Sequence, residues 1–185
     1  MRRNITLILG GARSGKSRFA EAHALAIAAD RTLQPVYVAT SEVRDEEMRE
    51  RIEHHRQSRD ERWQTLEEPL KLSELISAEA RPDRILLIDC LTLWLSNQQE
   101  QGADMAALTT SLVEALNNAS GPVVLVSNEV GLGIVPANEL ARAFRDVAGR
   151  VNQAVARAAI DVFFVASGLT LPLKTNGVPV GPEYS

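Results

Sequence analysis

Residues 10–17 combine three glycines with two serines, an arginine and a lysine, and they directly follow the apolar run of residues 5–9. The order Gly-Gly-Ala-Arg-Ser-Gly-Lys-Ser is the pattern of a phosphate-binding loop. Its glycines allow a tight turn with inward N–H groups, and the following helix adds its positive dipole end. Lys16 is expected to contact the β- and γ-phosphates and Ser17 to hold Mg²⁺. The loop predicts binding of a nucleoside triphosphate, but kinases, GTPases, ATPases and transferases all share it.

Asp89 is the next candidate, because it follows the four apolar residues of a predicted strand, 85–88. A carboxylate at this place holds Mg²⁺ in many phosphate-loop proteins, directly or through water. The alternative is an aspartate that caps the following helix. Together with the phosphate loop, the pattern favours the metal role.

A histidine pair, His54 and His55, lies in the charged segment 45–59, which is predicted to be helical. His55 shares a face with Met48 and Ile52, whereas His54 lies about 100° away on the polar face. Such a histidine is either a solvated side chain or a nucleophile, since a neutral imidazole attacks phosphorus near neutral pH. The residues alone leave both interpretations open. His23, inside another predicted helix, is interpreted as structural.

The segment 127–136 places Ser127, Asn128 and Glu129 beside two glycines after another predicted strand. Loops of this kind contact substrates, although a plain strand-to-helix connection would show the same pattern. Thr40 and Ser41, after the second predicted strand, are similarly expected to cap a helix or to touch phosphate or nucleoside.

Short, β-branched apolar runs alternate with helical patterns along the chain, which predicts an α/β fold. The expected strands are residues 5–9, 36–39, 85–88, 123–126 and 162–165. The expected helices are residues 17–29, 45–59, 72–80, 103–117 and 138–159. We expect a P-loop NTPase-type, mostly parallel sheet with helices on both faces in a single domain, 1–174, and a flexible tail, 175–185. Ligands of such sheets gather at the carboxyl ends of the strands.

Composition narrows the class of protein. The 185 residues carry a formal net charge of −4, so no general basic field favours nucleic acid or an anionic membrane. No apolar run has the length of a membrane span, and the two arginines near the N-terminus do not form a signal peptide. The single cysteine, Cys90, excludes an internal disulfide and a cysteine-built metal site. These features predict a cytoplasmic protein.

Several motifs in order along the chain resemble one family, the bifunctional adenosylcobinamide kinase / adenosylcobinamide-phosphate guanylyltransferases of cobalamin synthesis. Besides the phosphate loop, the resemblance rests on segments 37–41, 45–48, 51–56, 63–69, 89–97, 127–136 and 144–153. It implies two reactions, phosphorylation of the aminopropanol hydroxyl of adenosylcobinamide and transfer of GMP from GTP to the resulting phosphate. It also implies a covalent histidine–GMP intermediate, with His54 as the guanylylated residue, and a homotrimer. From the net charge we expect no nucleic-acid partner.

The resemblance assigns roles residue by residue. It makes His54 and Lys16 catalytic, and Ser17 and Asp89 the residues that hold Mg²⁺; the family sometimes has Glu at the position of Asp89. Glu67 is taken as the nucleotide-contacting glutamate, although the adjacent Glu68 could align there. The nucleotide-binding residues that it implies are Gly10, Gly11, Ala12, Arg13, Ser14, Gly15, Lys16, Ser17, Ala39, Thr40, Ser41, His55, Arg56, Gln57, Ser58, Glu67 and Asp89.

Two other functions stay open at this point. One is a simple phosphate-loop kinase of a small molecule, in which the histidine pair is only structural. The other is a nucleotide-dependent switch ATPase or GTPase that modifies no small molecule. The sequence does not decide whether ATP or GTP donates the phosphoryl group.

Overall fold

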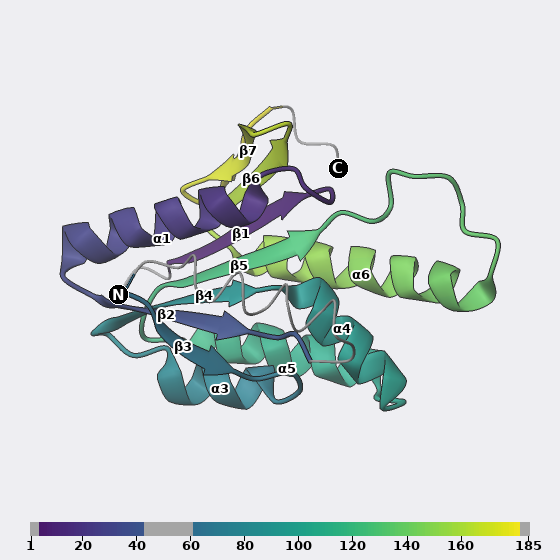
Figure 1. Cartoon of the computed structure of the whole chain (residues 1–185), viewed down its shortest axis with the longest axis horizontal. Helices are drawn as coiled ribbons and strands as arrows, with labels where there is room; N and C mark the ends of the chain where they lie inside the picture. The colour runs from purple at the N-terminus through teal and green to yellow at the C-terminus, as the bar shows by residue number, and fades with distance from the viewer. Residues whose placement is uncertain (1–3, 43–60, 182–185) are drawn as a thin grey trace.

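An eight-stranded sheet runs through the computed structural model, which describes residues 4–42 and 61–181 (Figure 1). The strands lie in the order β3-β2-β4-β5-β1-β6-β7-β8. The first six of these are parallel, and β7 and β8 are added antiparallel. The strands are β1 (Ile5–Gly10), β2 (Gln34–Ala39), β3 (Gln64–Glu67), β4 (Arg84–Asp89), β5 (Val123–Asn128), β6 (Asp161–Ala166), β7 (Leu169–Thr175) and β8 (Val178–Pro179).

Helices cover both faces of the sheet, as the sequence predicted. They are α1 (Lys16–Arg31), α3 (Leu72–Glu79), α4 (Leu91–Glu100), α5 (Met105–Asn118) and α6 (Glu139–Ala158). Helix α1 packs on one face, where buried Ala20, Ala24 and Ala28 allow close approach to the strands. Figure 1 shows α3, α5 and α6 together on the opposite face. The two faces bury separate apolar clusters, with Trp94 in the larger one.

The predicted strands are all present, and four elements were not predicted: β3, α4, β7 and β8. The predicted helix at residues 45–59 lies outside the described residues. Part of the expected flexible tail is paired with the sheet, because Thr175 faces Val178 across the β7–β8 turn and the Val180 N–H donates to the Leu173 carbonyl at 2.9 Å. No helix within the described ranges is long and apolar enough to cross a membrane.

Helix α6 begins and packs largely as its sequence predicts. The Asn138 side chain caps it by accepting a hydrogen bond from the Ala141 N–H at 2.7 Å. The helical pattern of residues 138–159 puts Leu140 on the same face as Val147, Ala148, Val151 and Val155, and so predicts that it packs. Leu140 is instead 68% exposed, because the first turn of α6 extends past the sheet with the loop before it (Figure 1). Packing against the sheet is confirmed further along the helix, where Ala148, Val151 and Val155 are buried.

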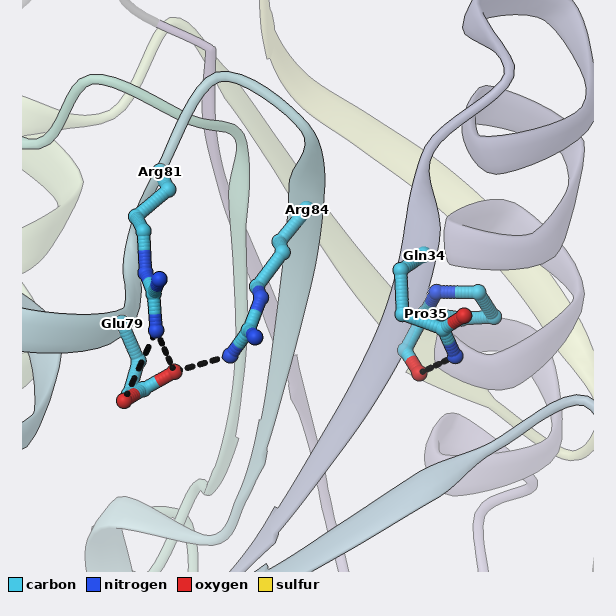
Figure 2. Close-up of polar contacts among 5 residues, drawn as sticks. All are labelled: Gln34, Pro35, Glu79, Arg81 and Arg84. Atoms are coloured by element: carbon cyan, nitrogen blue, oxygen red, sulfur yellow. Dashed lines mark hydrogen bonds and ion pairs between the residues drawn. The ribbon is translucent and has the colours of Figure 1, made fainter.

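Polar contacts stabilise the amino ends of β2 and β4 (Figure 2). The Glu79 carboxylate, at the end of α3, accepts hydrogen bonds from Arg81 and from Arg84, the first residue of β4. Gln34, the first residue of β2, donates through Nε2 to the Pro35 carbonyl at 3.2 Å and to the Arg62 carbonyl at 3.1 Å. These contacts fix the edge of the sheet opposite the predicted site.

Candidate functional site

The candidate site is the edge formed by the carboxyl ends of the parallel strands. Ala39 is in register with Glu67 on one side and with Asp89 on the other. Gly10 is in register with Asn128. The strand order therefore sets Glu67, Ala39, Asp89, Asn128 and Gly10 in a row along one edge. Segments that are distant in the sequence thus meet where α/β sheets bind ligands.

The phosphate loop has the closed shape that its glycines predicted. The Gly11 carbonyl accepts hydrogen bonds from the Ser14 N–H at 3.3 Å and from Lys16 Nζ at 3.2 Å. Arg13 and Gly15 have left-handed backbones, with φ of 55° and 96°. Lys16 is thus folded back over the loop, where a phosphate would compete with the Gly11 carbonyl for its ammonium group.

Two close approaches explain why glycine occupies positions 10 and 15. A Cβ on Gly10 would lie 2.5 Å from the Val165 carbonyl oxygen and 2.6 Å from Ser14 Oγ. At Gly15 a side chain would add strain to a positive φ and would approach Gly168 Cα to 3.3 Å. Gly168 also donates its N–H to the Ser14 carbonyl at 2.8 Å. The β6–β7 turn therefore supports the loop, a role that the sequence did not indicate.

The loop presents groups suited to an anion. Helix α1 begins at Lys16, no acidic side chain lies in its first turn, and Gly15 has no side chain to cap it. Its first N–H groups therefore face the loop together with the positive end of the helix dipole. Ser14 Oγ is buried and has no hydrogen-bond partner among the described residues, which a bound phosphate oxygen would supply.

Asp89 does not cap the following helix, which was the alternative to the metal role. It is the last residue of β4, and Cys90 stands at the start of α4 without a side-chain capping bond. One carboxylate oxygen, Oδ2, accepts a hydrogen bond from the buried Tyr37 hydroxyl at 3.1 Å. Tyr37 was predicted only as part of a motif, and its orienting role comes from the structure. The carboxylate of Asp89 and the hydroxyl of Ser17 are both hard oxygen donors, which suits Mg²⁺.

Thr40 is fully buried, and its polar groups are used within the protein. Its hydroxyl donates to the Cys90 carbonyl at 2.7 Å and accepts from the Cys90 N–H at 2.9 Å. Its carbonyl accepts from Asn97 Nδ2 at 2.8 Å, and its N–H donates to the Asp89 carbonyl at 3.3 Å. Thr40 therefore positions the turn after Asp89. The prediction that it contacts the nucleotide stays untested, and Ser41 beside it is half-buried.

The two neighbouring glutamates differ in their surroundings. The Glu68 carboxylate accepts hydrogen bonds from the Leu70 and Lys71 N–H groups at 3.0 and 2.7 Å, where the chain enters α3. Glu67 is exposed at the end of β3. This arrangement favours Glu67 as the glutamate that faces a ligand.

The segment after β5 is joined directly to the phosphate loop. The Glu129 N–H donates to the Gly10 carbonyl at 3.1 Å, and the Glu129 carboxylate accepts from the Gly131 N–H at 2.5 Å. Asn128 lies half-buried beside Gly10. The segment therefore lies at the binding edge, as its composition predicted.

Other predicted site residues lie outside the described ranges. They are His54, the predicted nucleophile, and its predicted nucleotide-binding neighbours His55, Arg56, Gln57 and Ser58. In residues 4–42 and 61–181, no three His, Cys, Asp or Glu side chains gather to hold a metal by themselves. A metal bound there would need a further donor, such as a phosphate.

Two titratable side chains, His23 in α1 and Cys90 after β4, are structural. His23 contacts Phe19 and Phe163 with ring centroids 5.8 and 5.7 Å apart, and burial lowers its pKa against an opposing effect of Asp161. This confirms His23 as a structural residue. Burial, and then the negative charge of Asp89, raise the pKa of the Cys90 thiol to about 11. Cys90 is therefore a neutral, unreactive thiol at physiological pH.

Similarity to solved structures supports the fold. A solved ATPase domain aligns with a TM-score of 0.58 at 14% identity, covering 97% of this chain and 79% of that one. The flagellar accessory protein FlaH from Methanocaldococcus jannaschii aligns with a TM-score of 0.55 at 14% identity, covering 97% and 82% of the two chains. The chain thus has the fold of phosphate-loop NTPases.

Similarity in sequence identifies the family. The chain is 45% identical to the bifunctional adenosylcobalamin biosynthesis protein CobU of Escherichia coli (strain K12), over 91% of this chain and 98% of the relative. It is 46% identical to the protein CobP of the same description from Pseudomonas aeruginosa, over 91% of this chain and 96% of the relative. The profile of the family described as cobinamide kinase / cobinamide phosphate guanyltransferase matches residues 6–173. The chain belongs to this family.

Proposed function

We propose that this protein phosphorylates adenosylcobinamide and then transfers GMP from GTP to the product, which gives adenosylcobinamide-GDP and pyrophosphate. The observation that carries the proposal is the meeting of the phosphate loop, Asp89 and Glu67 at one sheet edge, in a chain that matches the family over residues 6–173. A switch NTPase that modifies no small molecule has no need of the family's motifs outside the phosphate loop.

The protein is proposed to act in the cytoplasm.

In the kinase step the substrate hydroxyl attacks the γ-phosphorus of a nucleoside triphosphate. A P–O bond forms, the bond to the leaving nucleoside diphosphate breaks, and the hydroxyl proton is released. Lys16 and the N–H groups at the start of α1 stabilise the charge on the phosphates, since this reaction depends on positioning and on electrostatics. Ser17 and Asp89 would hold Mg²⁺, which when bound neutralises phosphate charge.

In the guanylyl transfer His54 attacks the α-phosphorus of GTP. A P–N bond forms as the bond to pyrophosphate breaks, and Lys16 and the loop N–H groups stabilise the leaving group. A phosphate oxygen of adenosylcobinamide phosphate then attacks the same phosphorus, and the P–N bond breaks. Two half-reactions of this kind predict ping-pong kinetics.

The experiment combines adenosylcobinamide with three forms of the protein and uses GTP labelled at the α-phosphate to follow guanylyl transfer. Parallel reactions with ATP or GTP labelled at the γ-phosphate follow phosphorylation. The wild type should form labelled adenosylcobinamide-GDP, Lys16→Ala should lose both activities, and His54→Ala should lose only guanylyl transfer. Wild-type protein that hydrolyses nucleotide without modifying adenosylcobinamide would leave a switch NTPase. Phosphorylation without guanylyl transfer would leave a simple kinase.

We also propose that the chain forms a homotrimer, as the resemblance implied. Two exposed apolar groups support self-association, since patches of this kind commonly mark interfaces. One group lies before and at the start of α6, with Leu132, Ile134 and Val135 at 80%, 97% and 63% exposed. The other lies on β7 and β8 and includes Leu169, Leu171 and Val178.

A further inference from the structure

Unpartnered buried polar atoms gather at the end of β5. Within the described residues, Ser14 Oγ, Asn128 Oδ1 and Asn152 Oδ1 are buried without a hydrogen-bond partner. Asn152, on α6, is only 6% exposed, and its Nδ2 donates to the Asn128 carbonyl at 3.4 Å. Buried polar atoms are normally paired. The unpaired Ser14 Oγ, in the phosphate loop, and Asn128 Oδ1, beside Gly10, therefore indicate a missing ligand group.

The backbone N–H and carbonyl of Asn128 both form hydrogen bonds within the protein, so only its side chain is available to bind a ligand. Its N–H donates to Thr92 Oγ1 at 2.8 Å, its carbonyl accepts from Asn152, and the next N–H, of Glu129, donates to the Gly10 carbonyl at 3.1 Å. The main chain of Asn128 is thereby fixed to α4, α6 and β1.

The Asn128 side chain lies on the phosphate-loop face of the sheet. Side chains alternate along a strand, and Val124 and Val126 of β5 belong to the cluster under α1. Asn128 therefore shares that face, next to Gly10, where the loop leads into α1. The order β4-β5-β1 places it between Asp89 and the loop. The residue as a whole is half-buried, whereas its Oδ1 is buried and unpaired.

We propose that Asn128 is a catalytic residue of the kinase step, which binds the substrate hydroxyl; this rests on the proposed kinase function. Its Oδ1 accepts the hydroxyl hydrogen bond after rotation of the carboxamide, while Nδ2 faces an oxygen of the transferred phosphoryl group. A carboxamide takes no proton, so Asn128 aligns the hydroxyl with the γ-phosphorus and does not act as a base. Asn152 is a positioning residue that acts through the Asn128 carbonyl.

The first test compares wild type with Asn128→Ala and Asn128→Ser, the second a smaller polar side chain that keeps the site hydrated. The kinase kcat should fall about 100-fold in both variants, as is typical when an aligning contact is lost. Nucleotide affinity and guanylyl transfer to adenosylcobinamide phosphate should change less than about twofold, because that acceptor has no hydroxyl to align. Asn118→Ala, an exposed asparagine at the end of α5, is the matched control and should leave both activities unchanged.

The second test uses a deoxy analogue of adenosylcobinamide that lacks the acceptor hydroxyl. Wild type should bind the alcohol about three- to tenfold more tightly than the analogue, and this ratio should approach one in Asn128→Ser. An unchanged kcat and ratio in Asn128→Ser, or a parallel loss of guanylyl transfer, overturns the proposal. Weaker nucleotide binding only in the presence of Mg²⁺ overturns it too, since Asn128 would then act on the metal. A wild type without kinase activity refutes the proposed function itself.

Discussion

Gly10 shows how a single residue sets the geometry of the site. Its missing side chain lets the Val165 carbonyl and Ser14 Oγ come within 2.5 and 2.6 Å of where a Cβ would stand. The sequence predicted a glycine-dependent loop here, but Val165, one of the two residues that approach Gly10, is distant in the chain. Its contact with Gly10 is set by the pairing of β1 with β6.

We expect Gly10→Ala to weaken nucleotide binding at least about tenfold, because the added methyl group displaces Ser14 and the loop. Titration calorimetry with GTP and Mg²⁺ measures this. Gly149→Ala is the matched control, since no atom lies within 4 Å of its added Cβ and alanine favours a helix. Equal affinity of Gly10→Ala and the control would contradict the packing argument.

His23 makes stability depend on pH. Burial lowers its pKa in the folded state, while the unfolded chain titrates near about 6.5. Below that pH the unfolded state binds more protons, so the free energy of unfolding falls as the pH falls through this range. Above about pH 6.5 the imidazole is neutral in both states, and its full contribution to the free energy of unfolding is present.

Urea unfolding at pH 7.5 and 5.5 checks this sign against His23→Phe, which keeps an aromatic ring and removes the titration. Wild type should lose more stability than the variant over this interval. His54 and His55 are common to both proteins and cancel in the comparison. An equal loss, or a gain of wild-type stability on acidification, would contradict the assignment.

At the scale of elements, α4 holds the ends of neighbouring strands in place. Asn97 Nδ2 donates to the Thr40 and Pro69 carbonyls at 2.8 and 3.1 Å. Trp94 and Gln98 both donate to the Leu70 carbonyl. One helix thus fastens the segments that follow β2 and β3, and with them Glu67 and the turn after Asp89.

Asn97→Ala should lower the free energy of unfolding by about 2 kcal/mol, because the carbonyls of buried Thr40 and half-buried Pro69 lose their donor. Urea denaturation gives the value. Asn118→Ala, on the surface of α5, should change it by less than about 0.5 kcal/mol. A cost for Asn97→Ala no larger than that of the control would show that α4 does not hold these segments.

The sequence predicted the elements with strong periodicity and missed those set by their neighbours. Residues 91–95 alternate leucine with threonine and tryptophan, which suits a strand as well as the helix that forms. In β3 only Leu66 is a large apolar residue, and pairing with β2 decides its conformation. Pro172 inside β7 argues against a strand, but it is tolerated because β8 pairs only with Lys174 and Thr175.

The features of the site also fall into those that the local sequence predicts and those that contacts between distant residues determine. The predicted roles of the phosphate loop and Asp89 follow from local sequence, because a loop or a strand end is a local structure. Support from Tyr37, Thr40 and Gly168 could not be predicted, since each contact joins residues from separate strands or turns. The prediction that His54 is the nucleophile stays a prediction.

At the scale of the whole molecule, exposed apolar side chains support the proposed homotrimer. Ile134 is 97% exposed and Leu140 is 68% exposed, in a segment that extends past the body of the sheet (Figure 1). A second copy of the chain that covered them would remove apolar surface from water.

Light scattering on the purified protein should therefore give three times the mass of one chain. An Ile134→Asp variant should shift the mass towards the monomer, because a buried carboxylate opposes association. Asp substituted for the exposed Ser111 of α5 serves as the control and should leave the trimer intact. A monomeric wild type at all concentrations would refute the trimer.

The central claim is that His54 carries a guanylyl group between GTP and adenosylcobinamide phosphate. The most direct measurement is the mass of the intact protein after mixing with GTP and Mg²⁺, without a corrinoid acceptor. Wild type should gain the mass of one covalent GMP, which should be lost on addition of adenosylcobinamide phosphate and be absent in His54→Ala. An unchanged wild-type mass, or a full adduct in His54→Ala, would contradict it.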